Sequence, residues 1–98
     1  MHNSRRGHDR HEEQSDCVRR YESQLGREQP GFFDVSEFEM IIDHYLANNE
    51  ARRAQGALEM ARRQHPGSVE VTFCEGLVHM GMGRLNKALE IFDVLERI

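Results

Sequence analysis

The sequence is poor in cysteine, which bears on both its compartment and its chemistry. Its 98 residues include two cysteines, Cys17 and Cys74, far apart in the chain. Two cysteines are too few for a disulfide framework, and their spacing fits no zinc-binding pattern. Because reduced thiols are typical of cytoplasmic proteins, we expect the chain to be cytoplasmic.

Long apolar runs are also lacking. Residues 1–7 carry two arginines with no apolar stretch behind them, so this segment is not expected to act as a secretory signal. The longest apolar runs fall far below the roughly 20 residues that a membrane-spanning helix needs. Acidic residues outnumber Lys and Arg by 17 to 13, and the basic residues are spread evenly rather than gathered in a stripe. We therefore expect neither a membrane nor nucleic acid as a partner.

Catalytic signatures are absent from the sequence as well. It contains no Ser-His-Asp or Cys-His arrangement and no Gly-rich phosphate loop. Cys74 and His79 are five residues apart, so on a helix they point to different faces. His2, His8 and His11 belong to a polar stretch without the supporting residues of a metal site. The sequence therefore predicts that the protein is not an enzyme and holds no cofactor and no metal.

Polarity and periodicity divide the chain into three parts. Residues 1–14 are polar and predict a disordered tail, because they cannot bury enough apolar surface to offset the entropy of ordering. Residues 15–34 predict a short capping helix followed by a linker. Residues 35–98 are strongly periodic and predict one helical domain.

In the capping segment, apolar residues recur at weak helical spacing. Val18, Tyr21 and Leu25 fall on one face of the expected helix. Phe32 and Phe33 lie side by side in the linker after it. We expect this pair of aromatic rings to fasten the capping helix onto the domain that follows.

The periodic part predicts four helices. Ser36 and Glu39 form an expected capping box at the first, and Val35 and Met40 suit the hydrophobic staple that accompanies such a box. Asn49 is expected to end this helix, since Asn tolerates the left-handed conformation. The other three helices cover about residues 50–64, 69–82 and 85–98.

The second and fourth of these helices share a pattern at a constant step of 34 residues. The two helix stops, Asn49 and Gly83, are separated by the same step. When an apolar stripe of a helix and the turn before that helix both recur after the same number of residues, the sequence indicates a tandem repeat of a helical hairpin. The pairs in the stripe are Ala51 and Leu85, Ala54 and Ala88, Leu58 and Phe92, and Ala61 and Leu95.

Residues 35–98 resemble tetratricopeptide repeats, a family of 34-residue helix–turn–helix units. The first unit, residues 35–68, matches the bulky, small and proline positions of that motif. The second unit, residues 69–98, is weaker, since Thr72, Glu75 and His79 stand where bulky residues are expected. The matching residues are Phe38, Ile41, Ile42, Tyr45, Ala54, Leu58, Ala61 and Pro66 in the first unit, and Gly76, Ala88 and Phe92 in the second.

The resemblance implies an all-α fold in which antiparallel helical hairpins stack as a short right-handed solenoid of about five helices. It also implies a concave face, lined by the first helix of each unit, that binds a peptide or protein segment. On this chain the lining positions would be acidic at one end and apolar at the other. They are Glu39, Asp43, Leu46, Phe73, Leu77 and Met80.

A second interpretation of these positions is open. Phe73, Leu77 and Met80 lie one step along from the expected bulky positions, so the third helix could be rotated and bury them as core. Glu39 and Asp43 would then belong to a solvated face.

The last helix carries a further apolar face, formed by Ile91, Val94 and Ile98. The corresponding residues of the second helix are Ala57, Met60 and Gln64, and we expect the third helix to cover Ala57 and Met60. The later face would then await a further hairpin, which predicts an N-terminal piece of a longer repeat protein. The alternative is a small protein that forms a weak homodimer through its C-terminal helix.

Three functions remain open from the sequence. The first is an interaction scaffold that binds a protein or peptide. The second is a self-association or stacking element. The third is a regulatory domain of a larger multi-repeat protein.

Overall fold

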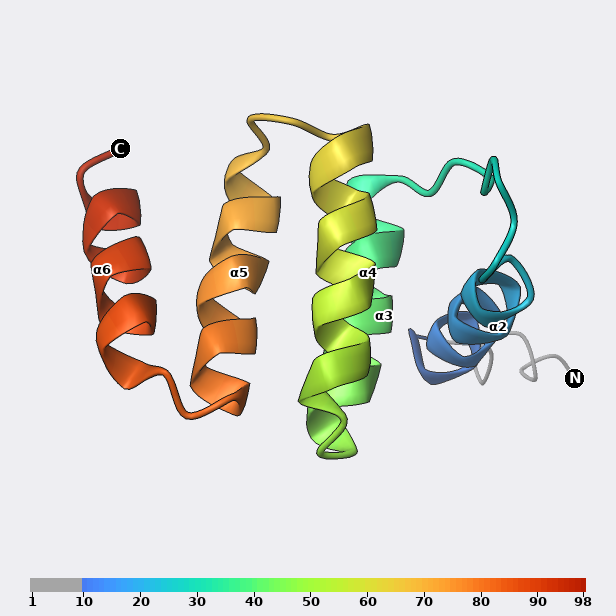
Figure 1. Cartoon of the computed structure of the whole chain (residues 1–98), viewed down its shortest axis with the longest axis horizontal. Helices are drawn as coiled ribbons and strands as arrows, with labels where there is room; N and C mark the ends of the chain where they lie inside the picture. The colour runs from blue at the N-terminus through green and yellow to red at the C-terminus, as the bar shows by residue number, and fades with distance from the viewer. Residues whose placement is uncertain (1–9) are drawn as a thin grey trace, which may run out of the picture.

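The computed structural model describes residues 10–98, which form five α-helices joined by turns and one longer linker (Figure 1). No strand occurs within this described range, so the all-α expectation is confirmed there. The helices are α2 (Arg10–Glu22), α3 (Val35–Ala47), α4 (Ala51–Gln64), α5 (Val69–Gly81) and α6 (Leu85–Glu96).

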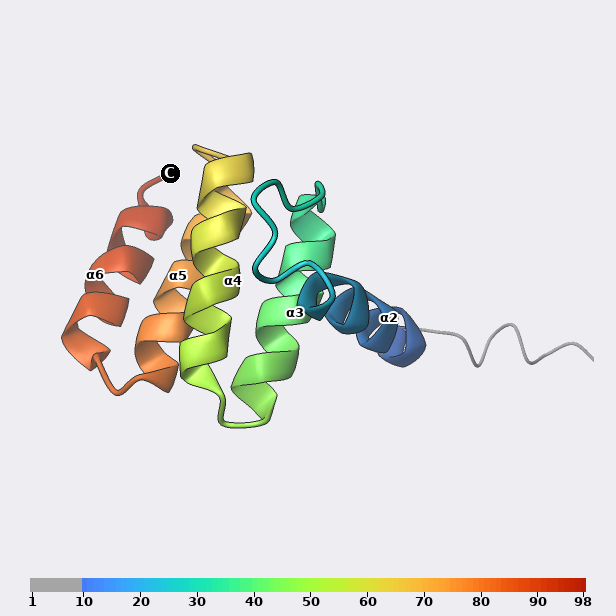
Figure 2. The same cartoon turned by 45° about the vertical axis from the view of Figure 1, so that its right-hand side comes forward.

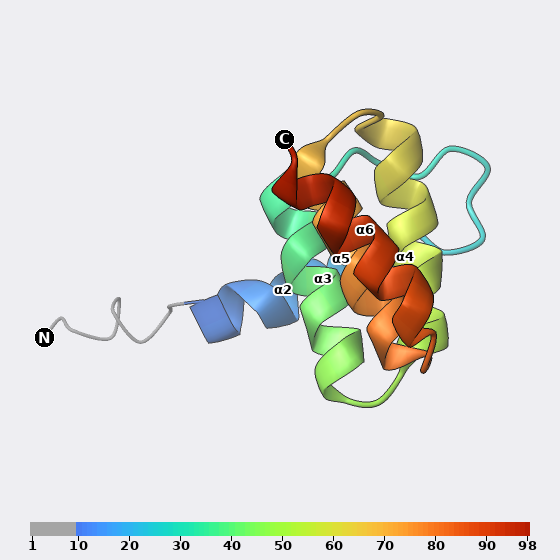
Figure 3. The ribbon, with the colours of Figure 1, turned by 90° about the vertical axis from the view of Figure 1, so that its left-hand side faces the viewer.

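Two antiparallel hairpins, α3–α4 and α5–α6, make up most of the described chain. Helix α5 packs against both α3 and α4, while α6 packs on α5 and α2 packs on α3. As a result, α2 and α6 lie at opposite ends of the row of helices (Figures 1 and 2). Seen from the α6 end, α3 and α4 lie on either side of α5 (Figure 3). The second hairpin therefore joins the first through one of its two helices.

The start of α3 differs from the sequence prediction. Asp34, not Ser36, is the N-cap: its Oδ1 accepts the Glu37 amide at 2.9 Å, and the Glu37 carboxylate accepts the Asp34 amide at 3.0 Å. The predicted box at Ser36 and Glu39 is wrong because the Ser36 hydroxyl donates to the Asp34 carboxylate instead. With the cap moved back two residues, the staple pair becomes Phe33 and Phe38, whose rings lie 5.6 Å apart.

The ends of α3 and α5 share one backbone motif, 34 residues apart. Asn49 (φ 60°) and Gly83 (φ 77°) both adopt the left-handed conformation. Each stop is closed by the same long hydrogen bond, from Glu50 N to Tyr45 O and from Arg84 N to His79 O, both at 2.8 Å. This pattern satisfies the last carbonyls of each helix. The repeat step predicted from the side chains is therefore also present in the backbone.

The N-terminal segment, by which we mean residues 10–34, is helical from its first residue. Helix α2 begins at Arg10, so residues 10–14 are helical rather than part of a disordered tail, and the Gln14 amide donates to the Met40 carbonyl at 2.9 Å. The rest of the predicted tail, residues 1–9, lies outside the described residues. Val18 and Tyr21 are buried as expected, but Leu25 lies beyond the end of the helix and is exposed.

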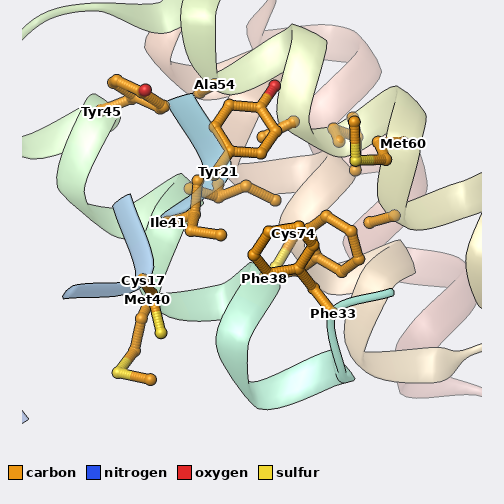
Figure 4. Close-up of a cluster of buried hydrophobic side chains, with 14 of the residues drawn as sticks. Cys17, Tyr21, Phe33, Phe38, Met40, Ile41, Tyr45, Ala54, Met60 and Cys74 are labelled. Carbon is orange, nitrogen blue, oxygen red and sulfur yellow. The ribbon is translucent and has the colours of Figure 1, made fainter. Parts of the chain in front are cut away.

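The core joins the N-terminal segment to the first hairpin (Figure 4). Phe33 is completely buried, with the Tyr21 ring at 6.2 Å and the Arg20 guanidinium 4.4 Å from its ring centroid. Phe32, next to it, is 68% exposed, so one of the two linker aromatics fastens the segment. Helix α5 adds its own apolar side to this core through Val71, Cys74 and Val78.

Candidate binding surface

Exposed apolar residues gather on the second hairpin. The described chain has nine exposed large hydrophobic residues, and seven of them lie in residues 69–98. Leu25 and Phe32 are the other two. Single exposed apolar residues are ordinary, whereas a concentration of them on one part of a protein marks a candidate interaction surface. The seven are Val69, Phe73, Met80, Leu85, Leu89, Val94 and Ile98.

The predicted groove residues of α5 do not form core. Phe73 and Met80 are each about half exposed, and Leu77 is partly buried. The residues that α5 buries against the first hairpin are Val71, Cys74 and Val78, on the other side of the helix. The alternative in which a rotated third helix buries Phe73 and Met80 is therefore wrong.

The predicted groove residues of α3 lie beside α5. Burial, together with the nearby carboxylates of Glu39 and Asp43, raises the pKa of the Cys74 thiol to about 12. A Cβ placed on Gly81 would approach the Leu46 side chain to 2.8 Å, so the end of α5 lies close against Leu46. The three α3 residues therefore border the contact between α3 and α5, and the three α5 residues lie on the outer side of α5.

Helix α4 completes the surface on which α5 packs. Gln55, Leu58 and Arg62 line a groove together with residues of α5. Across it, Arg62 Nη1 lies 3.3 Å from Glu75 Oε2. We call the surface that receives α5 the occupied seat. It consists of Glu39, Asp43, Leu46, Gln55, Leu58 and Arg62.

The second hairpin repeats this seat 34 residues later, and no element within residues 10–98 packs on it. We call this surface the open seat. A shallow groove along α6, lined in part by Leu89, Phe92 and Glu96, is its counterpart of the groove on α4. The open seat consists of Phe73, Leu77, Met80, Leu89, Phe92 and Glu96.

Leu89 is the apolar member of the open seat that sequence reasoning missed. Its counterpart is the polar residue Gln55, so a search for repeated apolar positions passes over it. Gln55 stands three residues before Leu58 on the same flank of α4. Adding 34 to the number of each residue on this flank, and not only to the apolar ones, would have identified Leu89.

The predicted face of Ile91, Val94 and Ile98 depends on which side of α4 the helix α5 covers, because the two hairpins repeat. The sequence predicts that the third helix covers Ala57 and Met60, whereas the α4 residues that line the groove with α5 include Gln55, Leu58 and Arg62. On the flank of α4 that carries Met60, the Gln64 side chain accepts the Phe33 amide at 2.9 Å, and Met60 is part of the core cluster to which both Phe33 and α5 contribute (Figure 4).

Gly56, on the same stripe of α4, lies beside the Tyr21 hydroxyl, so this whole flank faces the N-terminal segment. Val94 and Ile98 are exposed and Ile91 partly so, but they lie on the flank of α6 opposite to the open seat. A next element placed as α5 is placed would therefore meet Leu89 and Phe92 rather than Val94.

Neither of the two thiols is activated in this structure. Burial is the main cause that raises the pKa of both Cys17 and Cys74, so both thiols are protonated at neutral pH and poorly nucleophilic. His79 Nε2 lies 3.9 Å from the Glu75 carboxylate. Within residues 10–98, no group of three or more His, Cys, Asp or Glu side chains is arranged to hold a metal ion. His2 and His8 lie outside the described residues.

The helices of residues 10–98 are all too short or too polar to cross a membrane.

Comparison with known proteins adds no relative. No protein family, curated protein or solved structure matches the chain. The resemblance to tetratricopeptide repeats therefore rests on the motif positions alone, and the function has to be argued from the residues and their geometry.

Proposed function

We propose that this chain is a protein-interaction scaffold of the tetratricopeptide kind, which binds a peptide or protein segment along the side where α3 and α5 lie. The observation that carries the proposal is the exposed apolar surface of the second hairpin. Phe73 and Met80 are half exposed on α5, the helix that continues the row begun by α3. Large exposed aromatic and thioether side chains are frequent anchors at protein interfaces.

The carboxylates of Glu39 and Asp43 favour a ligand with basic residues. Asp43 is exposed and Glu39 half-buried, both close to the inner side of α5, so a bound segment would pass from these carboxylates to the apolar residues on the outer side of α5. A segment that combines basic and apolar residues complements such a surface. The scaffold needs no catalytic group, and its two buried, unlinked thiols suit the cytoplasm.

Selection from a random peptide library against the full chain tests this proposal. We expect the enriched peptides to carry basic and apolar residues, and Phe73→Gln to weaken their binding at least about tenfold, as loss of a buried aromatic anchor does. Phe32→Gln is the matched control, since Phe32 is the same type of residue and is also exposed, but lies in the linker beside His65. Equal binding of the enriched peptides to the wild type and Phe73→Gln would contradict the proposal.

Self-association is the competing function, because Leu89, Val94 and Ile98 expose apolar area near the C-terminal end. Light scattering during size exclusion separates the two functions. A monomer at high concentration supports the scaffold, whereas a dimer that excludes the selected peptides supports self-association.

A further inference from the structure

We propose that the open seat receives an amphipathic α-helix of another protein, docked on the second hairpin as α5 is docked on the first. The inference rests on the proposed function, and it adds the form of the partner and the position of its contacts. Its starting point is that one protein shows the same seat twice, once occupied and once open.

The geometry of the seat is repeated. Both hairpins consist of two antiparallel helices joined by the same backbone turn, with the left-handed residue at Asn49 or Gly83. The groove on α4 that contacts α5 and the groove along α6 are lined by side chains at equivalent positions. A helix is the element that fits the first seat, so a helix is the element expected in the second.

The open seat is more apolar than the occupied one. Glu39 is replaced by Phe73, Asp43 by Leu77 and Gln55 by Leu89. The remaining apolar positions stay apolar, with Phe92 in place of Leu58. Covering the open seat therefore removes more apolar surface from water than covering the occupied seat does. Its partner needs an apolar face at least as wide as that of α5.

The charge at the edge of the seat is reversed. In the occupied seat Arg62 pairs with Glu75 of α5, whereas the residue equivalent to Arg62 in the open seat is Glu96. Asp93, which also lines the groove of α6, is already paired with Arg97 at 2.6 Å, so Glu96 carries the reversed charge of the seat. A docked helix should therefore carry Lys or Arg where α5 carries Glu75.

The side of α5 that faces its seat gives the expected pattern of the partner. Its buried residues are Val71, Cys74 and Val78, and Glu75 lies beside them at the charged edge. The partner helix would thus have apolar residues at i, i+3 and i+7 and a basic residue at i+4. In its last turn, the partner should carry a small residue at the position of Gly81. Gly81 lies against Leu46 in the occupied seat, and Met80 is the residue equivalent to Leu46 in the open seat.

Two synthetic helices can test the inference against the full chain. Both copy residues 67–82, with Phe73, Leu77 and Met80 changed to Gln for solubility and Cys74 changed to Ala. The basic probe also carries Glu75→Arg, and the acidic probe keeps Glu75. Labelled at the N-terminus and titrated at low salt by fluorescence anisotropy, the basic probe should bind about fivefold more tightly than the acidic probe, as an exposed ion pair allows.

Variants of the chain locate the site. Leu89→Gln should weaken both probes about tenfold, because it removes a large apolar contact from the centre of the open seat. Val94→Gln is the matched control: it lies on the same helix and is similarly exposed, but it faces the opposite flank. Glu96→Arg should reverse the preference, so that the acidic probe binds more tightly than the basic one.

The outcomes separate this inference from the proposed function. Failure of both probes to bind, while library-selected peptides still bind through Phe73, would overturn the helix seat and keep the scaffold. Equal loss of binding in Leu89→Gln and Val94→Gln would also overturn it. A dimer that Leu89→Gln dissociates, with neither probe bound, would assign the open seat to a second copy of this chain and contradict the inference. Asp43→Asn should weaken extended basic peptides and leave both probes unchanged.

Discussion

The two hairpins share a design but differ in their surroundings. The first is covered on one side by α2 and the linker with Phe33, and on the other by α5. Among residues 10–98, only the first hairpin covers the second. Residues at equivalent positions are accordingly buried to different degrees: Met60 is 7% exposed and Val94 is 53% exposed.

The difference shows that burial here follows from neighbours rather than from the residue itself. Val94 is as apolar as Met60, and both occupy the same place in their hairpin. Stability should therefore be concentrated in the first hairpin, where each apolar side chain touches others on several sides. The second hairpin leaves apolar side chains exposed, so their burial contributes less to its stability.

The largest expected effect on the free energy of unfolding comes from Phe33, in the linker that covers the first hairpin. Phe33→Ala should destabilise the fold by about 3–5 kcal/mol, because it empties a completely buried site between Tyr21 and Phe38. Phe32→Ala is the control and should change stability by less than about 0.5 kcal/mol. Urea unfolding followed by circular dichroism measures both. Equal effects would show that the linker does not cover the hairpin as described.

A matched pair across the repeat tests the comparison directly. Met60→Ala should cost about 2–3 kcal/mol, within the range for a buried Met, whereas Val94→Ala at the equivalent position should cost less than about 0.5 kcal/mol. The same urea titration applies. If Val94→Ala proved as costly as Met60→Ala, the flank of α6 would be covered in solution and the contrast between the hairpins would fail.

Much of the fold could be predicted because its signals are local. The four periodic helices, the stops at Asn49 and Gly83 and the step between them depend on residues a few positions apart. The cap was misplaced by two residues because Asp34, Ser36 and Glu37 offer overlapping polar patterns. Which side-chain oxygen accepts a hydrogen bond from the free backbone amides depends on which residue is the N-cap of the helix. The packing of Phe33 on Phe38 fixes that residue as Asp34.

The binding surface was less accessible to sequence reasoning. Phe73 and Met80 were found through the motif, and their exposure agrees with a surface role. Leu89 was missed, and the flank of Val94 was chosen, since periodicity tells which residues are apolar but not which neighbour meets each flank of a helix. That information is contained in the contact between Arg62 and Glu75, which joins two helices and has no local signature.

The shared turn offers a smaller test of the likeness between the hairpins. Gly83→Ala should destabilise the chain by about 1–2 kcal/mol, because it places a Cβ on a residue with φ of 77°. Asn49→Gly should instead stabilise it by about 0.5 kcal/mol, since Asn already occupies the same conformation at some cost. Thermal unfolding of both variants checks the signs. Effects of the same sign would mean that the two turns are not equivalent.

The cap of α3 should give the smallest effect and a distinctive dependence on pH. Asp34→Ala should cost about 1 kcal/mol at pH 7, and Ser36→Ala, which leaves the cap in place, less than about 0.5 kcal/mol.

Hydrogen bonds from the Glu37 amide, and then from Ser36, lower the pKa of the Asp34 carboxyl below its ordinary value. A lowered pKa in the folded state means that the stabilisation is fully present above the unfolded pKa of about 4 and is lost as the pH falls through the folded value. The stability difference between wild type and Asp34→Ala should therefore be constant from about pH 5 to pH 7 and shrink below about pH 4. A difference that grew on acidification would show that the Asp34 carboxylate does not cap α3.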